Sequence, residues 1–299
     1  EMPEPLLAFA ITPKTKGDED KLSTALSRLR EEDPTLRVDR SDETHETVMY
    51  GMGEAHLDVQ IERMKRKFGV EVTTAPAKIA YRETIRGPGK GVGRHVKQTG
   101  GHGQYAVCTI EVEPLPRGEG FEYVDKIFGG AIPHQFIGSV EKGIVKTMQQ
   151  GVISGNPMVD IRCTLVDGKF HSVDSSDMAF QLAGSLALKE AAAAAGVVLL
   201  EPIVEVDVVV PESHTGDIMG DLNAKRAKIQ GVESAGAGKQ RVKALVPQAE
   251  VARYSIDLRS MTGGRAAFTM HFSHYEEVPS HLADKIIAAA QQEKEEARK

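Results

Sequence analysis

The stretch G-M-G-E-A-H-L-D-V-Q-I-E-R-M-K-R-K-F-G-V-E-V-T, residues 51–73, carries a helix signal followed directly by a strand signal. Four apolar residues recur at the spacing of an amphipathic helix: Leu57, Ile61, Met64 and Phe68. Gly69 suits the left-handed conformation that ends many helices, and residues 70–73 predict a short strand. A helix that runs straight into a strand indicates a mixed α and β fold.

The residues before this stretch predict one more helix and three more strands. Residues 18–32 have helical apolar spacing and end before Pro34, which cannot continue a helix. The strands are predicted at residues 6–11, 36–38 and 47–50. The resulting order, βαββαβ, is typical of a ferredoxin-like domain.

The last third of the chain repeats this order, although its sequence shows negligible similarity to the first third. Strands are predicted at residues 203–210, near 232, at 240–246 and at 267–275. Helices are predicted from Thr215 to about residue 229, over residues 249–261, and again after Pro279. The shared order predicts a second ferredoxin-like βαββαβ domain.

The middle of the chain has a different order, with strands predicted at residues 92–97, 105–113, 121–126 and 158–167. Helices are predicted over residues 139–150 and 175–195. In the second of these helices, Asp174 and Asp177 are expected at the N-cap and in the first turn. Its core side is expected to consist of Met178, Leu182 and Leu186. We therefore expect a multi-domain α+β protein whose parts are residues 1–79, 80–198, 199–278 and a C-terminal helix and tail, 279–299.

Composition narrows the class of protein. The chain has 299 residues and a net charge of −6, so any nucleic-acid contact must come from local cationic patches. Its two cysteines, Cys108 and Cys163, are expected to be buried reduced thiols of a cytoplasmic protein. No apolar run reaches the roughly 20 residues of a membrane span. The start, Glu-Met-Pro-Glu-Pro, is compatible with a fragment of a longer protein.

Two polar loops rich in glycine or serine, about 65 residues apart, are the strongest functional signal. The first reads Q-T-G-G-H-G-Q-Y-A, residues 98–106, and the second reads G-K-F-H-S-V-D-S-S-D, residues 168–177. The first loop ends the most cationic stretch of the chain, residues 82–102. Glycine lets a backbone approach a phosphate closely, so the loops point to RNA.

Other chemistry can be argued from the same residues. His171, Asp174 and Asp177 could form a metal or acid–base site, which would suit a metal-dependent hydrolase. Helix capping and an exposed loop histidine explain them more simply. Glu54, His56 and Asp58 do not share one helix face, and no phosphate-binding G-x-x-x-x-G-K-[ST] sequence occurs.

A third group of residues leaves two interpretations open. Lys225, Arg226 and Lys228 are predicted within one helical turn. They form either a solvated helix face or an RNA contact, because phosphate contacts need only positioned cations.

Seven motifs, in order and spacing over nearly the whole chain, resemble translation elongation factor G. They are G-M-G-E-A-H-L-D-V (51–59), Y-R-E-T-I (81–85), Q-T-G-G-H-G-Q-Y (98–105), G-G-A-I-P (129–133), V-D-S-S-D-M-A-F-Q-L-A (173–183), L-L-E-P-I (199–203) and F-S-H-Y-E-E-V-P (272–279). The resemblance implies ferredoxin-like domains III and V flanking an elongated α+β domain IV. It also implies a GTP-binding domain and a β-barrel that this chain lacks.

The resemblance implies a ribosome-binding part of a GTPase that promotes tRNA–mRNA translocation. It implies contacts to tRNA and mRNA at the decoding centre from Gln98, Thr99, Gly100, Gly101, His102, Gly103, Gln104, Lys169, His171, Ser172, Asp174 and Ser175. It implies contacts to ribosomal RNA, including the sarcin–ricin loop, from Arg259, Ser260, Lys225, Arg226 and Lys228. A monomer with both ribosomal subunits as partners and no membrane contact is expected.

The resemblance also implies where catalysis lies and which relatives are nearest. GTP and magnesium are expected in the absent N-terminal domain, so this chain has no catalytic or metal-binding residue and no cofactor of its own. His102 stands where elongation factor G has an arginine, and Q-T-G-G-H-G-Q and F-S-H-Y are more similar to the second, paralogous elongation factor G of some bacteria. The alternative function is therefore a ribosomal protection, recycling or remodelling GTPase without full translocase activity.

Overall fold

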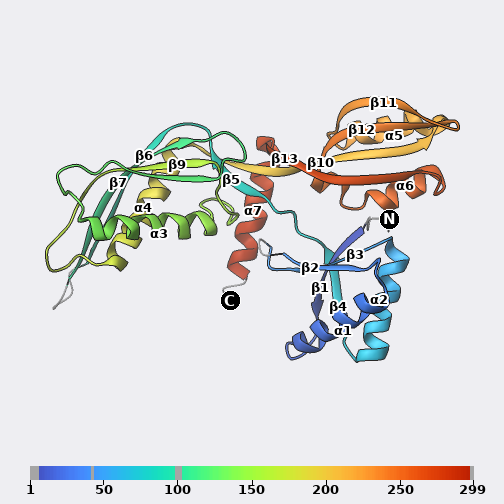
Figure 1. Ribbon diagram of the computed structural model, residues 1–299, viewed down its shortest axis with the longest axis horizontal. Helices are drawn as coiled ribbons and strands as arrows, with labels where there is room; N and C mark the ends of the chain where they lie inside the picture. Colours follow the sequence, from blue (N-terminus) through green and yellow to red (C-terminus); the bar gives the residue numbers. More distant parts are fainter. Residues whose placement is uncertain (1–6, 42–43, 98–102, 297–299) are drawn as a thin grey trace. The chain divides into compact units, whose positions relative to one another are not determined.

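The computed structural model describes residues 7–41, 44–97 and 103–296. The chain forms two compact units (Figure 1). Unit 1 contains residues 1–80 and 202–274, and unit 2 contains residues 81–201 and 275–299. None of the helices within the described ranges combines the length and the apolar character that a membrane span requires.

The first part of unit 1 has the predicted ferredoxin-like order. Its elements are β1 (Leu7–Pro13), α1 (Glu19–Glu32), β2 (Arg37–Arg40), β3 (Thr47–Gly51), α2 (Glu54–Phe68) and β4 (Val72–Pro76). The antiparallel sheet has the strand order β2-β3-β1-β4. Leu57 and Met64 of α2 are fully buried against Leu29 of α1 and Met49 of β3 in one core. Gly69 ends α2 in the left-handed conformation, as predicted.

The second part of unit 1 has the same topology. Its elements are β10 (Val197–Pro211), α5 (Thr215–Ala224), β11 (Lys228–Gly236), β12 (Lys239–Pro247), α6 (Tyr254–Thr262) and β13 (Ala267–Glu277). Short 3₁₀ helices lie at Glu212–His214 and Gln248–Val251. The strand order β11-β12-β10-β13 repeats that of the first part. Both ferredoxin-like domains are therefore confirmed.

The predicted length of α5 is wrong, and this moves three candidate RNA-binding cations. The helix ends at Ala224 and Lys225 caps it, while Arg226 has a φ of 59° and β11 begins at Lys228. Strand pairing explains the early end, because Lys228 pairs with Leu245 and Ile229 packs on the core. Lys225, Arg226 and Lys228 thus lie on a cap, a turn and a strand, and not within one helical turn.

The described residues of unit 2 form a four-stranded sheet and three helices. Its elements are β5 (Arg82–Ile85), β6 (Gly89–Lys97), β7 (Gln104–Pro114), β8 (Phe121–Asp125), α3 (His134–Gln150), β9 (Ile161–Lys169), α4 (Asp177–Ala195) and α7 (Ser280–Glu296). The sheet has the order β6-β7-β9-β8, with only β8 and β9 parallel among its described pairs. β5 pairs with Val197–Leu200, the first residues of β10.

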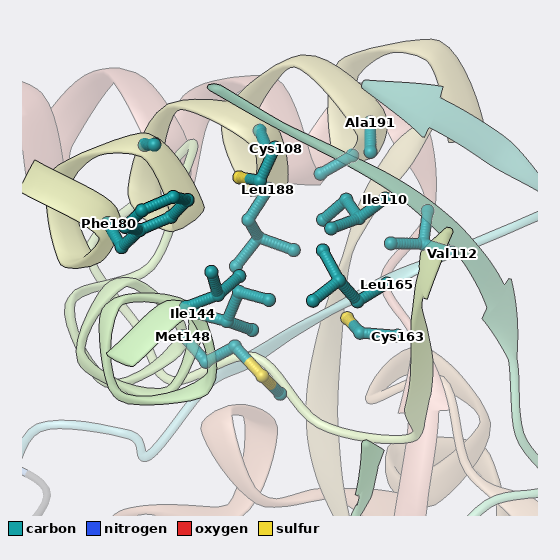
Figure 2. Packing of buried hydrophobic residues seen from close by; sticks show 14 of the residues in the cluster. Cys108, Ile110, Val112, Ile144, Met148, Cys163, Leu165, Phe180, Leu188 and Ala191 are labelled. Atoms are coloured by element: carbon teal, nitrogen blue, oxygen red, sulfur yellow. The ribbon is translucent and has the colours of Figure 1, made fainter. Parts of the chain in front are cut away.

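The core of unit 2 lies between this sheet and the helices α3 and α4, as Figure 2 shows. Ile110 of β7 and Leu165 of β9 meet Ile144 of α3 and Leu188 of α4 there. Cys108 and Cys163 lie in the same core as free thiols, as predicted. Burial raises the pKa of each thiol to about 12, so both stay protonated at neutral pH.

The predicted core side of α4 is wrong. Met178, Leu182 and Leu186 are exposed, by 61%, 39% and 43%. The helix buries Phe180, Leu188 and its alanines instead, and the alanines face the G-x-G-x-G sequence of β6. Backbone approaches backbone so closely there that only glycine fits on the strand. A Cβ at Gly93 would lie 1.7 Å from the carbonyl oxygen of Ala183.

We expect Gly93→Ala to destabilise unit 2 by at least about 3 kcal/mol, because overpacking against a fixed backbone leaves no side chain that can move away. Gly138→Ala is the matched control, since this helical glycine of α3 has no atom within 4 Å of a new Cβ. That change should stabilise the protein by up to about 1 kcal/mol. Urea unfolding measures both, and equal effects would contradict the packing argument.

Candidate nucleic-acid interface

Three loops of unit 2 share one edge of the sheet (Figure 1). At this edge Lys97 of β6 pairs with Gln104 of β7, and Val107 of β7 pairs with Lys169 of β9. Because β8 runs parallel to β9, it points toward this edge and ends at Asp125, opposite Leu165. The loop after β8 then reaches the end of β9, where Ile132 lies against Gly168. The β6–β7 turn, the β8–α3 loop and the β9–α4 loop therefore lie together, and we call this edge the tip.

The first and third of these loops are tied to each other by hydrogen bonds. The amide of Gly103 donates to Oδ1 of Asp174 at 3.0 Å, although the two residues are 71 positions apart. The amide of Tyr105 donates to the carbonyl of Asp174 at 2.9 Å. The hydroxyl of Ser175 donates to the carbonyl of Tyr105 at 2.6 Å. Two loops distant in sequence thus form one clasped structure.

His171 is held by its own loop, because two backbone amides and the Asp174 carboxylate all face its Nδ1. The amides of Val173 and Asp174 point at Nδ1, at 3.3 and 3.2 Å. Oδ2 of Asp174 also lies 3.4 Å from Nδ1. When Nδ1 of the neutral ring accepts from the two amides, the proton is on Nε2. The His171 side chain is about half exposed and its amide donates to the Ser175 hydroxyl at 2.9 Å. The ring can therefore offer one N–H donor to a ligand at the tip.

The predicted capping of α4 is correct only in part. Ser176 is the N-cap, and its hydroxyl accepts from the amide of Ala179 at 3.2 Å. Asp177 lies in the first turn as expected, and it accepts a hydrogen bond from Ser139 at 2.5 Å. Asp174 is not a cap, because its carboxylate binds the other loop.

The alternative of a metal site gains no support. Among the described residues, no group of three His, Cys, Asp or Glu side chains could hold a metal ion. His56 of the second candidate group has a structural role instead. Its Nδ1 accepts from the amide of Met52 at 3.0 Å, and its Nε2 lies 2.9 Å from Asp33. The hydrogen bond from the Thr35 hydroxyl lowers the pKa of the Asp33 carboxyl most, and the hydrogen bond with His56 lowers this pKa further.

The remaining predicted tip residues fall into two groups. Gln98, Thr99, Gly100, Gly101 and His102 lie outside the described residues. Gln104 is held by His95, with Oε1 of the glutamine 2.7 Å from Nε2 of the histidine, whereas Lys169 and Ser172 are exposed.

The predicted contacts in the C-terminal ferredoxin-like domain differ in their surroundings. Arg259 and Ser260 are exposed on α6, and among the described residues Arg259 makes no ion pair. Lys225 is mostly buried, with its Nζ 3.2 Å from carboxylate oxygens of both Asp221 and Asp257. Arg226 pairs with Glu250 at 2.9 Å. Arg259 is thus available to a ligand, whereas Lys225 is committed to linking α5 and α6.

Sequence reasoning missed a buried carboxylate in the Y-R-E-T-I motif. Glu83 has no exposed surface, and its two oxygens accept from the amides of four consecutive residues. The donors are Val152, Ile153, Ser154 and Gly155, at 2.6 to 3.3 Å. The Ser154 hydroxyl adds a bond of 2.7 Å. One side chain therefore determines the path of the loop after α3, and only the unusual acid within a strand signals it.

We expect Glu83→Gln to destabilise unit 2 by about 2–4 kcal/mol, because the amide NH₂ of glutamine must face backbone donors whichever way it turns. Glu111→Gln is the control, since Glu111 is an exposed residue that pairs with Lys90 at 3.1 Å. Thermal unfolding at neutral pH measures both variants. Equal stability of Glu83→Gln and the unmodified chain would show that the carboxylate does not hold the loop.

The chain matches models of one known protein family along nearly its whole length. Family models of elongation factor G match three consecutive segments: domain III over residues 2–76, domain IV over 77–196 and the C-terminus over 198–286. The fold and its tip are thus part of a translation elongation factor. The chain belongs to the elongation factor G family.

Individual relatives agree with this assignment. The chain is 55% identical to the elongation factor G-like protein of Mycobacterium tuberculosis, across 97% of this chain and 40% of the relative. It is 53% identical to elongation factor G of Aquifex pyrophilus, across 96% of this chain and 41% of the relative. The chain therefore spans about two fifths of the length of these curated relatives.

A solved structure shows the same fold. A crystal structure of a Thermus thermophilus protein matches with a TM-score of 0.85 and 42% identity, over 98% of this chain and 44% of that one. The relatives include both an elongation factor G and an elongation factor G-like protein, as the resemblance in the sequence predicted.

Proposed function

We propose that this chain is the ribosome-contacting part of a translational GTPase that promotes the movement of tRNA and mRNA. The observation that carries the proposal is the clasp between Gly103 and Asp174, which joins two loops at one edge of the sheet. Membership of the elongation factor G family is the second observation that supports the proposal. The chemistry required is positioning and phosphate contact, and the tip has groups suited to both.

Within this proposal the tip residues divide into two roles. His171 and Lys169 contact tRNA or mRNA, because one offers an outward N–H and the other an exposed ammonium group. Asp174 and Ser175 position the loops, because their side chains are already bonded within the tip. Gln98–His102, although outside the described residues, belong to the contact group on sequence grounds.

The second proposed contact is with ribosomal RNA, including the sarcin–ricin loop, through Arg259 and Ser260 of α6.

We expect Arg259→Ala to weaken binding to ribosomes about five- to tenfold at moderate salt, because one phosphate contact is lost. The unfolding midpoint should change little, since the side chain is exposed and makes no ion pair with the described residues. Lys225→Ala, the comparison variant, should instead lower stability by removing the link between α5 and α6. A stability loss in Arg259→Ala with unchanged binding would assign Arg259 a structural role.

His171→Ala in the full-length protein should slow translocation more than it weakens ribosome binding, because the contacts of α6 remain. Single-turnover translocation and equilibrium binding together measure this separation. Val173→Ala, which changes a side chain that is 62% exposed on the same loop, is the control. Translocation at the unmodified rate by His171→Ala would mean that the tip does not act on the moving tRNA.

GTP and magnesium belong, in this proposal, to the part of the parent protein that the chain does not span. The alternative, a ribosomal protection, recycling or remodelling GTPase paralogue acting in the cytoplasm, is favoured by the 55% identity to an elongation factor G-like protein. Translocation by the unmodified full-length protein distinguishes the two, because only a full translocase advances mRNA by one codon in each cycle.

A further inference from the structure

The most exposed of the described large apolar side chains belongs to the β8–α3 loop of the tip. Phe128 is 92% exposed, although burying a phenylalanine side chain normally stabilises a protein by about 2 kcal/mol. Gly129 and Gly130 follow it with φ values of 64° and 71°, which few other residues adopt. The backbone therefore has a defined bend that presents the ring to solvent.

The residues on either side hold this loop firmly. Ile127 packs against the core of unit 2, and its amide donates to Asp125 at 2.9 Å. Ile132 is buried and lies against Gly168. A Cβ added to Gly168 would be 2.4 Å from Cδ1 of Ile132. Phe128 is thus an outward side chain between two inward ones, and the loop is anchored to the end of β9.

The position of the loop links Phe128 to the proposed RNA contact. Figure 1 shows the β8–α3 and β9–α4 loops at the end of unit 2 where α3 and α4 begin. Phe170, the next residue after β9, is a second exposed aromatic at this edge, by 45%. Exposed Lys126 and Lys169 add cationic groups, and exposed His134 adds a ring nitrogen. The acid next to this stretch is Asp125, which accepts from the Ile127 amide.

An exposed aromatic ring among cations is the chemistry that recognises unpaired nucleobases, because the ring stacks on a base while the cations contact phosphates. We propose that Phe128 is a stacking platform for an unpaired RNA base, which makes the β8–α3 loop a third RNA-contacting loop of the tip. The charge around the ring favours RNA over an apolar protein surface. This inference rests on the proposed function and adds a binding residue to it.

The chain contains no tryptophan, so Phe128→Trp creates a single fluorescent reporter that preserves an aromatic face. Small ribosomal subunits programmed with mRNA and tRNA are the probe. We expect their addition to quench the emission of Phe128→Trp, because stacking on a base quenches indole. Val59→Trp, at a 56% exposed position of α2 in unit 1, should keep its emission.

Affinity measurements complete the test. Phe128→Ala and Phe128→Leu should bind these subunits about five- to tenfold more weakly, and Phe128→Trp should bind like the unmodified chain. All variants should unfold at the same midpoint, since the ring is exposed.

The outcomes separate the two proposals. If the unmodified chain does not bind the subunits, the proposed contact of the tip with tRNA and mRNA fails. If it binds and Phe128→Ala binds equally, only the stacking role fails. Unchanged binding by Phe128→Leu alone would show an apolar contact with a protein surface, and loss of self-association in Phe128→Ala would show contact with a second copy; either result overturns stacking.

Discussion

The close approach of α4 to β6 is the contact on which unit 2 depends. A Cβ at Gly89, Gly91 or Gly93 would lie 2.2, 2.3 or 1.7 Å from a carbonyl oxygen of α4. The same kind of contact joins α4 to α3, where a Cβ at Gly143 would lie 2.0 Å from the carbonyl of Gln181. Helix and strand therefore meet without an intervening layer of large side chains. The register of α4 sets where the β9–α4 loop ends, and thus where the clasp can form.

Buried carboxylates shape the loops that this framework leaves irregular. Glu83 gathers four consecutive amides after α3. Asp160, with a φ of 59°, accepts from the amides of Gly118 and Gly120, both at 3.0 Å, and so holds the β7–β8 connection. At the tip Asp174, whose side chain is partly exposed, does the same for Gly103. In each case an acid far along the chain satisfies backbone donors that a sheet or helix would otherwise have satisfied.

Where the sequence predicted the fold correctly, the signal was periodic. The apolar stripe of α2 and the βαββαβ order of elements in both ferredoxin-like domains follow from apolar spacing and turn residues alone. The side of α4 was predicted wrongly because large apolar residues normally mark the core, whereas here Ala183, Ala187 and Ala191 are buried and Leu182 is exposed. Only the glycines of the partner strand reverse that rule.

The clasp could not be predicted from the sequence either, because it depends on the register of β7 and β9. Glycine and serine content nevertheless identified both loops as functional candidates.

The contact between α4 and β6 also has a mechanical meaning. Large side chains between a helix and a sheet can change rotamer and absorb a displacement, whereas backbone atoms already in contact cannot. The 19 residues of α4, about 28 Å of helix, run beside β6 without a layer of large side chains that could change rotamer. A push on the tip would therefore reach the far end of unit 2 with little loss of amplitude. Stiffness of this kind is set by the smallest side chains of the domain.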